Sequence, residues 1–162
     1  MTYFPDLSPY EYCGLKDDDV IPTVNVGWLD NSKPYPQGFT SELFKEKLFQ
    51  FCQRDNAILF CLGYHECQFC ENPFFPLEVK RGEIITRLGN GEIRVIGQKV
   101  IYAAPTMIYH YVVAHNYLPP QEFVDAVLTG PSPASGEHKA LVKETEVFLV
   151  TYMLKEHKIF SK

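Results

Sequence analysis

HECQFC, residues 65–70, is the stretch from which the expected fold follows. Cys67 and Cys70 form a C-x-x-C pair, a spacing that lets two thiolates point at one metal ion from a tight turn, as in zinc knuckles. The alternative for such a pair is redox chemistry, which usually places the first cysteine at a helix N-terminus, where its pKa falls. Asparagine and prolines follow Cys70 and do not start a helix well. The stretch therefore predicts a zinc-knuckle-like turn, with a redox thiol pair as the weaker interpretation.

A second pair of ligands is predicted downstream in HYVVAH, residues 110–115. His110 and His115 form H-x4-H, a spacing found in Cys2His2 zinc sites. Residues five apart on an ideal helix differ by about 140° of rotation, so both imidazoles reach one ion only if the helix end loosens near His115. His65, two residues before Cys67, is the alternate ligand. The two pairs together predict a structural Zn²⁺ ion.

The segment between the two pairs, residues 71–109, has the pattern of an antiparallel β-meander. Strands are expected at residues 83–88 and 92–96, on either side of the Gly-Asn-Gly triplet at 89–91. This triplet is a hairpin signal because Asn and Gly tolerate positive φ. Residues 99–104 are expected to add a third strand. The interval is much longer than in a nucleic-acid-binding zinc finger, so a finger of that type is not predicted.

Helical and extended patterns alternate outside this region. Residues 40–54 carry one apolar stripe at helical spacing, which also predicts that Cys52 is a buried core thiol. Further elements are expected as helices at residues 106–116, 120–128 and 138–157 and as strands at residues 23–29 and 57–62. The result is an α+β fold in which an antiparallel β-meander packs with three to four helices. Residues 1–130 are expected to form a single core domain, and residues 131–162 a linker plus a C-terminal helix that packs on or extends the core.

Composition and charge limit the classes of function. The chain has 162 residues, of which 46% are hydrophobic and 22% charged, as is ordinary for one globular domain. A net charge of −5 argues against a general nucleic-acid binder, which needs a basic surface. Neither a run of about 18 apolar residues nor a signal-peptide pattern is present, so no membrane association is expected. The five cysteines lack the spacing of a disulfide framework, which favours a reducing, cytoplasmic environment.

Two carboxylates beside the cysteine pair raise the question of catalysis. Glu66 and Glu71 flank Cys67 and Cys70, and either could act as a general base beside a metal. Four protein ligands, however, close a tetrahedral site and leave no position for water. The zinc deaminases place a His-x-Glu element upstream and a proline before C-x-x-C, and this sequence has neither arrangement. A P-loop, a nucleophile elbow and a dinucleotide fingerprint are also absent from the sequence.

Several longer segments resemble a family of small bacterial proteins with no established activity. The similarity spans about residues 2–130 and is carried by YFPDLSPYEY at 3–12, VNVGWLD at 24–30, HECQFC at 65–70, NGEIRV at 90–95 and YAAPTMIYHYVVAHNYLPPQEFVDAVL at 102–128. The resemblance implies that the family shares the cysteine and histidine positions, which here are His65, Cys67, Cys70, His110 and His115. Residues 131–162 look like an extension beyond the shared core.

The expected function is that of a non-enzymatic protein-interaction domain with a structural zinc site. Its partner is expected to be another protein, and an immunity-type protein that neutralises a basic toxin is one concrete version, because a negative surface complements a positive one. The alternative is a zinc-dependent hydrolase with Glu66 or Glu71 as general base. A third interpretation is a redox thiol protein that uses Cys67 or Cys70.

Overall fold

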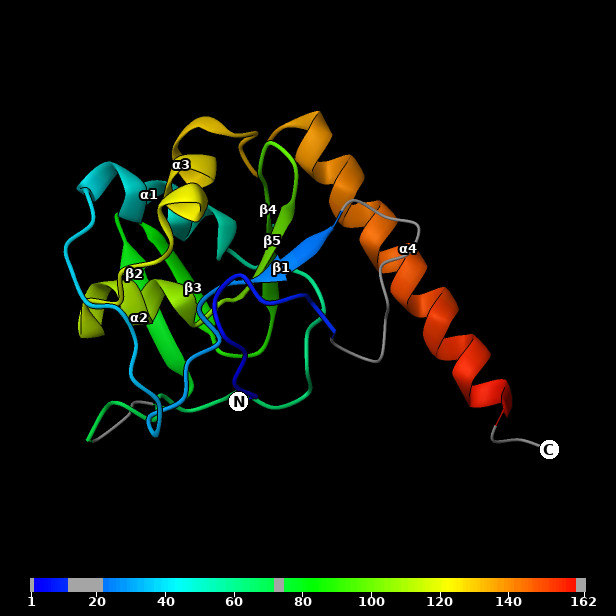
Figure 1. Ribbon diagram of the computed structural model, residues 1–162, viewed down its shortest axis with the longest axis horizontal. Helices are drawn as coiled ribbons and strands as arrows, with labels where there is room; N and C mark the ends of the chain where they lie inside the picture. The colour runs from blue at the N-terminus through cyan, green and yellow to red at the C-terminus, as the bar shows by residue number, and fades with distance from the viewer. Residues whose placement is uncertain (1, 12–21, 72–74, 160–162) are drawn as a thin grey trace.

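The computed structural model describes residues 2–11, 22–71 and 75–159, and for residues 149–159 it describes the helical backbone only. Cys13 therefore lies outside the described residues. The elements follow one another as β1 (Thr23–Asn25), α1 (Glu42–Phe51), β2 (Leu77–Arg81), β3 (Ile84–Leu88), β4 (Glu92–Ile96), β5 (Ile101–Pro105), α2 (Ile108–His115), α3 (Gln121–Thr129) and α4 (Gly136–Ile159). The predicted α+β class is confirmed (Figure 1).

A three-stranded sheet with the order β1-β5-β4 lies at the centre of the fold. Its middle strand, β5, runs parallel to β1 and antiparallel to β4. All five residues of β5 are buried, because neighbouring strands and helices cover it on both sides. Helices α1 and α3 pack against each other and against this sheet (Figure 1).

The remaining strands form a separate two-stranded sheet, a hairpin of β2 and β3. Arg81 is paired with Ile84, so Gly82 and Glu83 make a two-residue turn. Gly82 has φ of +59°, which fits the first central position of a type II′ turn, where glycine is favoured. The hairpin thus turns at residues 82–83, ahead of the triplet that the sequence favoured.

The predicted pairing of residues 83–88 with 92–96 across the triplet 89–91 is wrong. β3 pairs with β2 instead, and β4 pairs with β5. The triplet faces the segment 58–65, whose His65 N–H donates to the Gly89 carbonyl at 2.8 Å. A Cβ on Gly89 would lie 2.7 Å from the His65 carbonyl oxygen, so the glycine serves this close approach rather than a hairpin turn.

The strand expected at residues 57–62 is also wrong. In this stretch Ile58 forms one isolated bridge, to Glu92, and no ladder continues from it. Leu59 has φ of +53°, a left-handed conformation that interrupts extended backbone after a single pair. The apolar run alone could not reveal this break, because a buried strand and an irregular buried segment have similar composition.

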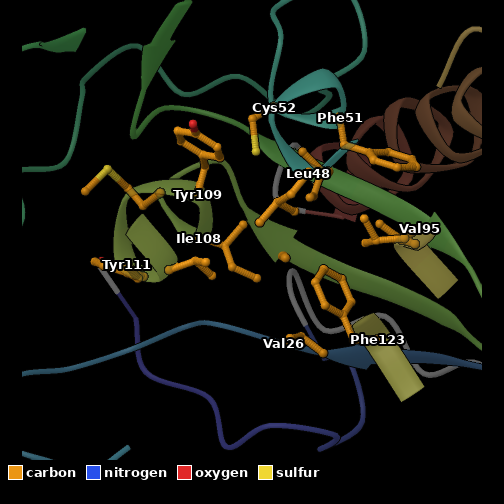
Figure 2. Close-up of a cluster of buried hydrophobic side chains, with 14 of the residues drawn as sticks. Val26, Leu48, Phe51, Cys52, Val95, Ile108, Tyr109, Tyr111 and Phe123 are labelled. Atoms are coloured by element: carbon orange, nitrogen blue, oxygen red, sulfur yellow. The ribbon is translucent and has the colours of Figure 1, made fainter. Parts of the chain in front are cut away.

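The hydrophobic core lies between α1, α2, α3 and the three-stranded sheet (Figure 2). Its fully buried members include Leu48 and Phe51 of α1, Ile108 of α2 and Phe123 of α3. Cys52 is 1% exposed, which confirms that it is a buried core thiol. Ser41 caps α1, since its hydroxyl accepts the Phe44 N–H at 3.1 Å.

A buried charged pair lies on β4. Arg94 and Glu92 are 2% and 4% exposed, and Arg94 Nη1 lies 2.7 Å from Glu92 Oε2. The Tyr10 hydroxyl donates to the same carboxylate at 3.0 Å, and the Arg94 guanidinium stacks over the Tyr10 ring at 4.6 Å. His138 of α4 lies 2.8 Å from the Arg94 carbonyl oxygen through Nε2. This polar network connects the N-terminal arm and α4 to the central sheet.

Helix α4 packs on the core through its first turns and then extends away from it (Figure 1). His138 is 1% exposed, whereas Val147 and Phe148 are 60% and 45% exposed. Among the described residues, no helix combines the length and the apolar composition that crossing a bilayer requires.

Candidate metal centre

The two cysteines lie on a short turn that several contacts hold in place. Cys67 is buried and Cys70 half-buried, and the two lie 3.7 Å apart. Asn31 anchors the turn from outside, because its side-chain amide donates to the Gln68 carbonyl at 3.4 Å. From inside, Phe69 packs its ring edge against Tyr35 at 5.2 Å. The predicted knuckle-like turn is therefore present.

The two histidines lie at the third and last positions of α2. The N–H groups of Asn116 and Tyr117 both bond to the Tyr111 carbonyl, five and six residues back instead of four. A wider last turn of this kind brings residues five apart closer to one face of the helix. The loosened helix end that the sequence required is thus present, and His110 Nε2 lies 3.2 Å from His115 Nε2.

The four donor atoms converge, all within 4.8 Å of one another. Cys67 Sγ lies 3.3 Å from His115 Nε2, and Cys70 Sγ lies 3.3 Å from His110 Nε2 and 3.4 Å from His115 Nε2. Zinc binds thiolate sulfur at about 2.3 Å and imidazole nitrogen at about 2.0–2.1 Å, with the four ligands at the corners of a tetrahedron. The edges of that tetrahedron are then about 3.8 Å for S···S, about 3.6 Å for S···N and about 3.3 Å for N···N. The three S···N distances above and the N···N distance of 3.2 Å match those edges to within a few tenths of an ångström.

Burial sets the protonation of these groups. It lowers the pKa of His110 to about 4, with a smaller contribution from the neighbouring His115, and it also lowers the pKa of His115. Both imidazoles are consequently neutral at pH 7 and have a lone pair to donate. Burial raises the pKa of the Cys67 thiol, so a cation must replace its proton before the sulfur can act as a thiolate ligand.

Within the residues that the structure describes, the group that could hold a metal consists of Cys67, Cys70, His110 and His115. His65, the alternate ligand, is not in it. Its side chain is exposed and lines a separate cavity of about 180 Å³, together with Cys61 and Asn90. Glu66 and Glu71 are both exposed and do not belong to the group either.

An aromatic shell surrounds the ligands, and the sequence analysis did not identify it. The ring of Phe69 lies 5.4 Å from that of His115 and 5.5 Å from that of Tyr111. The Tyr35 hydroxyl donates to the His115 carbonyl at 3.4 Å. Phe69 and Tyr111 adjoin the ligands in sequence and could have been noticed, but nothing in the sequence pointed to Tyr35.

The chain was compared with protein families, curated proteins and solved structures. A family model described as "Domain of unknown function (DUF7919)" matches residues 2–128. The matched region contains the four cysteine and histidine positions and the elements from β1 to the end of α3 except its last residue, and it stops before α4. A search of curated proteins and a search of solved structures both found no match.

Proposed function

The chain belongs to the family described as a domain of unknown function (DUF7919), and we propose that it is a non-enzymatic protein-interaction domain stabilised by a structural Zn²⁺ ion. One observation carries the proposal: two sulfur and two nitrogen donors stand at the separations of a tetrahedral site, on segments far apart in the sequence. The ligands are Cys67, Cys70, His110 and His115.

The donor set favours zinc among the common metals. Two thiolates and two imidazoles in a tetrahedron are typical of structural Zn²⁺, whereas Mg²⁺ and Ca²⁺ take six or more oxygen ligands. When bound, the ion would connect the turn before β2 to the end of α2. Its contribution would be to the free energy of folding, because the unfolded chain has no preformed site.

The geometry supports the two other interpretations less well. A hydrolase needs an open coordination position for water, and four protein donors fill a tetrahedral site. Glu66 and Glu71 are exposed side chains outside the donor group, so no specific observation favours either as a base. For a redox thiol, Cys67 is buried and no described helix begins at the turn that carries it.

The interaction role rests on the surface of the chain. Leu62 and Phe39 are more than nine-tenths exposed, and each offers apolar area to a partner. The net charge of −5 favours a basic partner, and an immunity-type protein that neutralises a basic toxin remains our concrete version of this role. The cytoplasm is the proposed compartment, because a reducing environment keeps the thiol ligands available.

Metal analysis of the purified chain tests the zinc proposal. We expect about one zinc per chain in the wild type, loss of the ion in Cys67→Ser, and retention in Cys61→Ser, whose cysteine is exposed and outside the group. Cobalt substitution tests closure, because a four-coordinate sulfur and nitrogen site absorbs visible light far more strongly than a five-coordinate one with water. Absence of a transition metal from the wild type, or an unchanged zinc content in Cys67→Ser, would refute the proposal.

Isolation of the tagged chain from its own cells tests the interaction role. We expect a basic protein to co-purify at low salt and to be released at about 0.5 M salt, because exposed charge pairs are screened at that ionic strength. Recovery of the chain alone under both conditions, at native expression levels, would count against the role.

A further inference from the structure

The β2–β3 hairpin ends in an open strand edge. Arg81 and Ile84 flank the two-residue turn and form the first hydrogen-bonded pair, so alternate residues of β3 bond to β2. The N–H and C=O groups of Ile85 and Arg87 consequently point away from β2. None of the other described segments offers these groups a backbone hydrogen bond.

The half of this edge next to the turn, Ile84 and Ile85, carries no charged side chain or proline that would oppose strand pairing. Proteins commonly blunt an open edge with charged side chains, proline or a bulge. Here Ile84 and Ile85 are 48% and 60% exposed and stand side by side on the strand. A two-stranded sheet is also only marginally stable by itself, and a third strand would extend its hydrogen bonding.

The open edge forms one wall of a groove of about 550 Å³, which we call the β3 groove. Its lining includes Ile84–Arg87 on the strand side and Arg54, Phe60 and Tyr64 on the other side. Four residues of extended chain span about 14 Å, so the groove follows the strand for roughly that length. The edge is therefore recessed behind a second wall and does not project from the surface.

The charges of the β3 groove define what complements it. Arg87 is neutralised by Glu78, with Nε and Oε1 2.8 Å apart. Arg54 stacks over the Phe60 ring at 4.7 Å, and neither Arg54 nor Asp55 has an ion pair among the described residues. The groove thus offers the apolar residues Ile84 and Ile85 and, in its lining, one charge of each sign without an ion pair among the described residues. A short segment with an apolar middle and one acidic and one basic side chain complements it, whereas a polyanion does not.

We propose that the β3 groove binds an extended peptide segment of a partner protein, which pairs with β3 as the third strand of the hairpin sheet. The backbone groups of Ile85 and Arg87 supply the pairing, and Ile84, Ile85 and Phe60 supply apolar contact. A second folded copy of this chain fits less well, because its own β3 is recessed behind the same wall. This inference rests on the proposed function in that a partner protein supplies the segment.

A labelled synthetic peptide tests the proposal on the full, zinc-loaded chain. The probe is KTVVTE-amide with fluorescein on its N-terminal amine, so that the lysine side chain stays charged, and its binding is followed by fluorescence anisotropy. We expect saturable binding at about 10–500 μM and about tenfold weaker binding of an analogue that is N-methylated at both valines. Successive amides of a strand point to opposite sides, so this analogue loses an inter-strand hydrogen bond in either register.

Two matched variants locate the binding. Ile85→Lys places a charge on the open edge and should weaken binding at least tenfold, while Leu43→Lys, at a 56%-exposed position outside the groove, should leave it unchanged. Thermal unfolding of both variants verifies that they remain folded. Equal binding of the N-methylated peptide, no binding up to about 5 mM, or a dimer that Ile85→Lys dissociates would each overturn the proposal.

Metal content separates this test from that of the proposed function. If the chain holds about one zinc and the peptide does not bind, the groove inference fails and the zinc proposal stands. If the chain as purified holds no metal and the peptide still binds through β3, the zinc proposal fails and the groove inference stands.

Discussion

Two regions of the molecule connect segments that are far apart in the sequence, and they do so in different ways. The cysteine–histidine centre brings the turn before β2 together with the end of α2, and its four donor atoms lie within 4.8 Å of one another, close enough to hold a metal ion. The polar network of β4 joins the N-terminal arm and α4 to the sheet, and its two charges neutralise each other directly. The first connection would be completed by an added ion, whereas the second is complete within the chain.

The difference teaches how each connection can be lost. A metal centre of this kind is removed reversibly, because the ligands take up protons when the ion leaves. Glu92 and Arg94 have no such alternative partner, since both are almost fully buried. Loss of either residue leaves an uncompensated charge in the interior, which is among the costliest single changes a fold can undergo.

The largest effect is expected from removing the ion. Treatment with a strong chelator should lower the free energy of unfolding by about 5 kcal/mol or more, which corresponds to a fall of roughly 10–20 °C in Tm for a chain of this size. Calorimetry of the treated chain and of the chain after zinc is restored measures the change and its reversal. An unchanged Tm after verified loss of metal would show that the centre does not support the fold.

Breaking the buried pair should have the next largest effect. Arg94→Met leaves the Glu92 carboxylate buried with Tyr10 as its remaining partner, and the free energy of unfolding should fall by about 3–5 kcal/mol. The double variant Glu92→Gln/Arg94→Met should be less destabilised than the sum of the two single changes, because the isolated charge is gone. Urea unfolding gives both values, and zinc added afterwards should not restore them.

A smaller effect is expected at Asp6, which connects the arm to the end of α2. Its carboxylate accepts bonds from the Tyr117 hydroxyl at 2.8 Å and the Gly27 N–H at 2.9 Å, yet burial raises its pKa above the usual 3.8. A raised pKa in the folded state means that stability is greatest when Asp6 is protonated and declines as pH rises through the folded-state pKa.

Asp6→Asn tests this pH dependence. The amide cannot ionise, so the variant should gain stability relative to the wild type as pH rises above the usual aspartate pKa, because the wild type loses stability there. Urea titrations at a series of pH values, with zinc present throughout, measure the difference. A difference that stays constant with pH, or that runs in the opposite direction, would contradict the assignment.

The smallest effect is expected on the surface. Lys45 and Glu42 approach to 2.7 Å on the exposed side of α1, three residues apart. Lys45→Gln should cost no more than about 0.5 kcal/mol, because exposed pairs gain little over hydration. The same urea assay measures this loss in the free energy of unfolding. A loss as large as that of Arg94→Met would contradict the distinction between buried and exposed charges.

The sequence was sufficient to group the four residues of the candidate metal centre, because that grouping depends on residue type and spacing. Cys67, Cys70, His110 and His115 could be proposed together, and so could the helix end that must loosen between the histidines. The α+β class followed from the alternation of apolar periods. Residue type, spacing and apolar period are local properties of the sequence. The grouping of the two cysteines with the two histidines is long-range, and a shared metal ion is the reason to expect it.

The pairing of the strands could not be predicted in the same way. β2 has the sequence LEVKR, whose charged residues gave no clear strand signal, yet it is paired along its whole length. Leu59 has a left-handed backbone conformation, which leucine rarely adopts and which the sequence therefore does not predict. Glu92 and Arg94 alternate with apolar residues on β4, a pattern that predicts a solvent-facing side of the strand. Both are buried because the N-terminal arm covers them, and sequence patterns do not reveal a contact between residues so far apart in the chain.

The spacing between the cysteine turn and the end of α2 has a mechanical consequence. Cys67 and His115 are 48 residues apart, and the chain between them contains β2, β3, β4, β5 and most of α2. An ion bound to both residues would transmit a pulling force directly from Cys67 to His115. The segment between them would then bear no force. Stretched by its ends in an optical trap, the zinc-bound chain would extend about 160 Å less than the metal-free chain before the coordination bonds rupture.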